Sequence, residues 1–91
     1  MNLSDKVTIP AQVMVRPVGD EIVILDLANG SYFGLNPVGV RIWQLLTDGQ
    51  TLAQVCDSML GEFEVSPEDI ERDVLTLVQT LVDKSLVTVV G

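Results

Sequence analysis

Residues 29–46, NGSYFGLNPVGVRIWQLL, mark the point where an expected sheet gives way to an expected helical region. The segment Ser31–Leu35 predicts a short strand, because aromatic and apolar residues lie there between turn-forming residues. Asn36-Pro37 then predicts a helix start, with Asn as the N-cap and Pro at the first helical position. We assign Trp43, on that helix, to the core.

Two further strands are expected before this stretch. Val13–Val18 and Ile22–Asp26 are rich in β-branched residues, and Gly19-Asp20 between them suits a two-residue type II′ hairpin turn. Ala28-Asn29-Gly30 supplies the next turn, because Asn and Gly accept positive φ. The pattern therefore predicts a three-stranded antiparallel meander in which Ser31–Leu35 is the third strand.

The two edges of this meander differ. Pro17 lacks an N–H and interrupts any further pairing along the first strand. Ser31–Leu35 carries neither the Lys nor the Pro that normally blunts an exposed edge. An open edge accepts an extended peptide as an added strand. The alternative is that another segment, such as Leu86–Val90, covers this edge.

Three helices are expected after the meander. Asp48-Gly49 ends the first helix, and Thr51 with Gln54 forms a capping box for the second, which ends at Gly61. Ser66-Pro67 begins the third, which should reach about Lys84. The fold class is therefore α+β and winged-helix-like. We expect one domain over residues 12–91, a flexible arm over residues 1–11, and a short terminal strand within residues 86–90.

The third helix carries more apolar residues than one packing face requires. The stripe assigned to the core consists of Ile70, Val74, Leu77 and Leu81. A second stripe lies roughly 90° away, is flanked by Glu71, and consists of Leu75, Val78 and Val82. This second stripe either widens the core face or contacts a partner outside the fold.

Charge and composition exclude several classes of function. The net charge of −8 is a poor match for nucleic acid or an anionic membrane surface. No apolar run approaches the roughly 20 residues that span a bilayer, and the single cysteine excludes an internal disulfide. We therefore expect a cytoplasmic protein that uses neither nucleic acid nor membrane as a partner.

Residues for catalysis are sparse. The chain has no histidine, and Cys56 lies among Val55, Met59 and Leu60 on an apolar helix face, which predicts a buried thiol. No spacing supports a metal site, a phosphate-binding loop or a nucleophile–base pair. We expect no enzymatic activity and no cofactor.

An ordered series of motifs resembles the PqqD-like family over residues 13–89. The motifs are Asp26 with Gly30-Ser-Tyr-Phe-Gly-Leu-Asn, Ile42-Trp-Gln-Leu-Leu, Asp48-Gly49, Thr51-Leu52, Asp73-Val74 to Leu81, and Lys84-Ser-Leu-Val. The Gly-Ser-Tyr-Phe sequence that leads into the third strand resembles the corresponding segment of the broad family more than that of the member serving pyrroloquinoline quinone synthesis. The resemblance leaves the pathway open.

This resemblance implies a non-catalytic peptide chaperone, a recognition element for ribosomally made, post-translationally modified peptides. Such domains bind the leader segment of a precursor peptide and present it to a radical S-adenosylmethionine enzyme or a leader peptidase. The leader adds to the third strand and lies against the third helix. By position, the implied contacts are Ser31, Tyr32, Phe33, Gly34 and Leu35, together with Glu71, Leu75, Val78 and Val82.

Two other functions remain open. A winged-helix DNA-binding or regulatory domain requires a basic recognition helix, whereas the third helix offers only Arg72 and Lys84 among acidic residues. A homodimerisation module would pair Ser31–Leu35 with its own copy.

Overall fold

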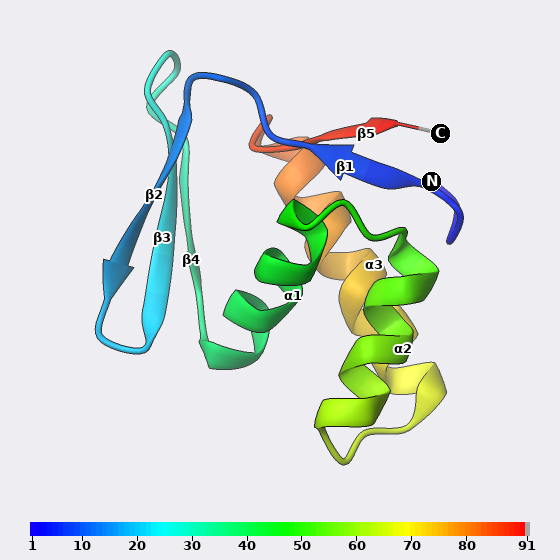
Figure 1. The fold of residues 1–91 in the computed structure, drawn as a ribbon. Coiled ribbons are helices and arrows are strands. Elements are labelled where there is room, and N and C mark those ends of the chain that lie inside the picture. Colours follow the sequence, from blue (N-terminus) through cyan, green and yellow to red (C-terminus); the bar gives the residue numbers. More distant parts are fainter. Residues whose placement is uncertain (91) are drawn as a thin grey trace.

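The computed structural model describes residues 1–90 and contains two small sheets and three helices (Figure 1). The elements are β1 (Lys6–Thr8), β2 (Val13–Val18), β3 (Glu21–Asp26), β4 (Tyr32–Leu35), α1 (Pro37–Thr47), α2 (Leu52–Glu62), α3 (Pro67–Asp83) and β5 (Thr88–Val90). Strands β2, β3 and β4 form an antiparallel sheet in that order, and β1 pairs with β5. This arrangement confirms the α+β class and the meander followed by three helices.

The β2–β3 hairpin has the turn that the sequence predicts. Val18 pairs with Glu21, so Gly19-Asp20 is a two-residue loop. Gly19 has φ +66°, whereas Asp20 is not among the non-glycine residues with positive φ. Positive φ at the first central position alone is the requirement of a type II′ turn, which matches the right-handed twist of the strands.

Strand β1 was not expected, because residues 1–11 show no strand pattern. In the structure Lys6 pairs with Val90 and Thr8 with Thr88, and Val7 between them is buried. The same N-terminal segment accepts hydrogen bonds from the start of α2, at 2.9 Å from Leu52 N to the Asp5 carbonyl oxygen. The mobility of residues 1–11 stays a prediction. The expected terminal strand is β5, and it covers β1 rather than β4.

The helices begin where local sequence predicts. The Asn36 side chain accepts a hydrogen bond from Gly39 N at 2.9 Å, and Thr51 and Gln54 form both bonds of a capping box. Ser66 accepts from Asp69 N at 3.2 Å. Each bond satisfies an N–H that the first turn of a helix leaves unpaired.

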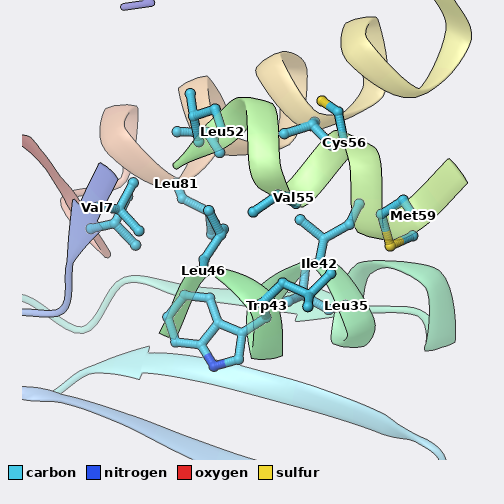
Figure 2. Packing of buried hydrophobic residues seen from close by; sticks show 14 of the residues in the cluster. Val7, Leu35, Ile42, Trp43, Leu46, Leu52, Val55, Cys56, Met59 and Leu81 are labelled. Atoms are coloured by element: carbon cyan, nitrogen blue, oxygen red, sulfur yellow. The ribbon is translucent and has the colours of Figure 1, made fainter. Parts of the chain in front are cut away.

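The core lies between the three-stranded sheet and helices α2 and α3, with α1 in the middle. Helix α1 contacts β3 and β4 on one side and α2 on the other. Figure 2 shows Trp43 and Leu35 on the sheet side of this cluster, and Val55 and Cys56 on the α2 side. Trp43 is 5% exposed and Cys56 8%, so both assignments to the interior are confirmed.

Candidate functional site

Strand β4 has a free edge. It pairs with β3 through Leu25–Tyr32, Ile24–Phe33 and Val23–Gly34, and no other strand within residues 1–90 pairs with it. Asp26 N donates to the Ser31 carbonyl oxygen at 2.8 Å, which sets the alternation of the ladder. Hydrogen-bonded pairs recur every second residue in an antiparallel ladder. The N–H and C=O groups of Phe33 therefore point to β3, whereas those of Tyr32 and Gly34 point to the free edge.

The turn before β4 holds the start of this edge in place. The Asp26 side chain is 2% exposed and accepts hydrogen bonds from Ala28 N at 2.8 Å and Asn29 N at 3.2 Å. Gly30, with φ +78°, donates its N–H to the Asp26 carbonyl oxygen at 2.9 Å. A buried carboxylate that accepts two backbone N–H groups makes the turn costly to rearrange.

The end of β4 is held by close packing against α1. Leu35 is 4% exposed, and the next residue, Asn36, caps the helix. A Cβ added at Gly39 would lie only 3.2 Å from the Leu35 side chain. Glycine at this position therefore lets the first turn of α1 approach β4 closely, and both ends of the free edge are anchored.

A groove of about 360 Å³ runs beside this edge. Its walls are Phe33, Gly34, Leu35 and Asn36 at β4, Val38, Gly39 and Ile42 on α1, and Asp73, Thr76, Leu77 and Thr80 on α3. Apolar side chains from all three elements meet there, and polar groups of α3 stand beside them. A strand added to β4 would direct every second side chain toward these walls.

The structure brings only part of the expected site together. Of the expected strand residues, Phe33, Gly34 and Leu35 line the groove, whereas Ser31 and Tyr32 do not. None of the expected α3 residues, Glu71, Leu75, Val78 and Val82, lines it. Val78 is 0% exposed and belongs to the core, while Leu75 and Val82 are half-buried against that core. Leu75 borders two shallow hollows outside this groove: one adjoins it through Thr76 and Thr80, and the other lies beside Glu71. The expectation that this stripe runs alongside the strand does not match the groove, and the peptide contact of these residues stays a prediction.

Helix geometry explains the difference. Successive residues of an α-helix are about 100° apart, so each core residue has one neighbour on either flank. Leu75 follows Val74 and Val82 follows Leu81, and these later residues share one flank. The residues that precede core positions, such as Leu77 before Val78, share the opposite flank, and this is the flank that faces β4.

Sequence reasoning missed the α3 wall of the groove because that wall mixes polar and apolar residues. Asp73, Thr76, Leu77 and Thr80 follow the spacing i, i+3, i+4, i+7 of one helix face. A search for apolar stripes passes over such a face. Lys84 was missed because it lies at the C-cap of α3, outside any apolar stripe, and its ammonium lies 5.8 Å from the centre of the Phe33 ring.

Charged groups elsewhere support the scaffold. Arg41 of α1 donates to Glu62 of α2 through Nε at 2.6 Å and through a terminal nitrogen at 2.8 Å. The hydrogen bond from Arg41 holds the pKa of the Glu62 carboxyl below its ordinary value. Burial raises the pKa of the Cys56 thiol, and the nearby charges of Glu71 and Asp57 raise it further, so the thiol stays protonated.

The described residues include no group of three or more His, Cys, Asp or Glu side chains placed to hold a metal ion. Over the same residues, every helix is too short or too polar to cross a bilayer.

Comparison with known proteins connects this geometry to a family. The model of the family described as coenzyme PQQ synthesis protein D (PqqD) matches residues 21–87. A solved structure of TbiB1 in complex with the TbiA(beta) leader peptide has a TM-score of 0.80 and 37% sequence identity, covering 87% of this chain and 92% of that chain. A lasso peptide synthetase B1 complexed with the leader peptide has a TM-score of 0.83 and 30% identity, covering 91% and 98%. No curated protein sequence matches.

Proposed function

The chain belongs to the PqqD family, and on that premise we propose that it binds the leader segment of a ribosomally made precursor peptide. The leader adds to β4 as an antiparallel strand and places alternate side chains in the groove beside α3. The chain catalyses no reaction itself and acts as a peptide chaperone. Both structural neighbours are complexes with a leader peptide, which supports this function.

The observation that carries the proposal is the free edge of β4 beside an apolar groove. The N–H and C=O groups of Tyr32 and Gly34 supply main-chain hydrogen bonds that depend on register but not on side chains. Leu77, Ile42 and Val38 supply an apolar surface for the leader side chains. Affinity then comes from the strand, and selectivity comes from the groove.

The bound leader is presented to a modifying enzyme. Docking raises the effective concentration of the rest of the precursor at that enzyme's active site. The partner is a leader peptidase or a radical S-adenosylmethionine enzyme, and the likeness to a lasso peptide synthetase B1 favours the peptidase. The encounter takes place in the cytoplasm, where the precursor is made.

Amide hydrogen exchange tests the proposal at single residues. Peptides encoded by short open reading frames next to this chain's gene are the ligands to test, and calorimetric titration first measures their affinities. The amides of Tyr32 and Gly34 should exchange quickly alone and slowly with peptide, because only the added strand accepts their hydrogen bonds. The Phe33 amide, which bonds to β3, serves as the internal control.

Two outcomes would refute the proposal: no measurable binding, or binding that leaves exchange at Tyr32 and Gly34 unchanged. Sedimentation velocity with and without peptide covers the remaining alternative. A stable dimer whose edge amides are protected before peptide is added would favour pairing of β4 with its own copy.

A further inference from the structure

The groove beside β4 is chemically different at its two ends. Asp73 is the one ionisable residue among those that line it, and it lies toward the N-terminal half of α3. Lys84, the C-cap of α3, lies beyond the lining residues at the C-terminal end of the helix, over the ring of Phe33, which does line the groove. A ligand that fills the groove therefore meets a carboxylate at one end and an ammonium at the other.

Neither charge is neutralised by a strong pair within the described chain. Asp73 has only an Arg72 nitrogen at 3.5 Å, and both side chains of that pair are more than half exposed. Exposed ion pairs of this kind contribute little. Lys84 makes no ion pair with any of residues 1–90, and its neighbour Asp83 instead accepts a hydrogen bond from Gln79 at 2.8 Å.

The spacing of the two charges sets a spacing in the ligand. Asp73 and Lys84 are separated by about 16 Å along α3, at 1.5 Å per residue. An extended peptide advances about 3.3 Å per residue, so about five peptide residues cover this distance. Side chains on one face of a strand recur every second residue. Two peptide charges that face the groove are therefore about four or six positions apart.

The direction of the chain sets their order. The sheet β2-β3-β4 is antiparallel throughout, and an added strand that continues this pattern runs antiparallel to β4. Figure 1 shows β4 and α3 running in opposite directions, so such a strand runs along α3 from Asp73 toward Lys84. The peptide meets the carboxylate first and the ammonium last.

We infer that the groove selects leader segments in which a Lys or Arg precedes an Asp or Glu by about four or six residues. An apolar residue between them, on the same face of the strand, contacts Leu77 and Ile42. This inference rests on the proposed function and states which leader peptides the chain accepts. Asp73 and Lys84 act as specificity determinants that fix both register and direction.

Selection from a random peptide library tests the inference whatever the natural precursor is. The full chain is immobilised and used to enrich peptides from an mRNA-displayed library long enough to span the groove. The test variant exchanges the two charges, D73K with K84E. The matched control reverses two separate exposed charges outside the groove, Asp20→Lys and Lys6→Glu, and has the same net charge. A neutralised variant, Asp73→Asn with Lys84→Gln, serves if the exchanged protein does not fold.

The expected consensus for the native chain is a basic residue, then an apolar one, then an acidic one. The exchanged variant should enrich the opposite order of charges and bind the native consensus about tenfold more weakly, since two weak attractions are lost and two repulsions are added. The neutralised variant should lose the charge preference and keep the apolar one. The control should enrich the native consensus.

Other outcomes separate this inference from the function it rests on. If the enriched peptides require the β4 edge but show no charge pattern, the inference is refuted and peptide binding stands. The same holds if the exchanged variant enriches the same charge pattern as the native chain. Enrichment of no peptide at all would refute the proposed function, and the inference with it.

Discussion

Replacing Gly34 by proline should strongly weaken peptide binding while leaving the fold in place. The Gly34 N–H points to the free edge of β4 and takes no part in the ladder with β3. Proline is tolerated on edge strands at positions where the missing N–H faces outward. The residue before it, Phe33, already has the extended backbone that a following proline favours.

The magnitude follows from the lost main-chain contact. A main-chain hydrogen bond contributes about 1 kcal/mol net, and a peptide carbonyl left unpaired in the complex costs about 1–3 kcal/mol in addition. A total of about 2 kcal/mol corresponds to a decrease in affinity of about thirtyfold. The pyrrolidine ring also occupies space along the edge, which makes this value a lower bound.

Calorimetric titration of Gly34→Pro and Gly34→Ala with the same leader peptide measures the difference. Alanine is the matched control, because a Cβ at residue 34 meets no atom within 4 Å and the N–H is retained. Urea unfolding of both variants verifies the fold. If both variants are folded and bind the leader within about twofold of each other, β4 is not the edge to which the peptide adds.

Three further predictions concern the groove and the scaffold. Leu77→Asp should weaken leader binding at least about tenfold, whereas Leu75→Asp, at a half-buried position on the opposite flank of α3, should change the affinity little. If calorimetry gives the reverse order, the peptide contacts the Leu75 flank of α3. The bond from Arg41 lowers the pKa of Glu62, so its stabilisation is complete above the ordinary value of 4.5 and is lost as pH falls through the lowered folded-state value. The stability advantage of the native chain over Glu62→Gln should therefore shrink in acid, and urea midpoints whose difference is constant with pH would contradict this. Ser85 has φ +60° after α3, so Ser85→Gly should raise the free energy of unfolding by up to about 1 kcal/mol; an unchanged or lower urea midpoint would count against strain at that position.

Local signals in the sequence predicted most elements of the fold. Three of these signals each act within four residues, so they can be recognised from neighbouring residues alone: Gly19, Asn36-Pro37 and the Thr51–Gln54 capping box. The register of the meander follows from the two turns that connect its strands. The sequence also indicated that β4, the last strand of the meander, lacks the residues that blunt an edge, but it left open whether residues 86–90 cover that edge.

The pairing of β1 with β5 was not foreseeable in this way. Lys6–Thr8 is too short to show alternation, and its partner Thr88–Val90 lies at the other end of the chain. Such a contact depends on where the helices bring the two termini. The same pairing decided that the C-terminal segment leaves β4 uncovered.

The sequence by itself determined that α3 is an amphipathic helix and that β4 lacks the residues that blunt an edge, because both properties arise from residues close together in the chain. Only the tertiary structure decided which flank of α3 faces β4. Leu75 and Leu77 are both half-buried beside the core stripe, and helical periodicity alone does not distinguish the two flanks on which they lie. The packing of α1 between the sheet and α2 breaks that symmetry. It turns Leu77, with Asp73 and Thr80, toward the strand and encloses Val78 in the core.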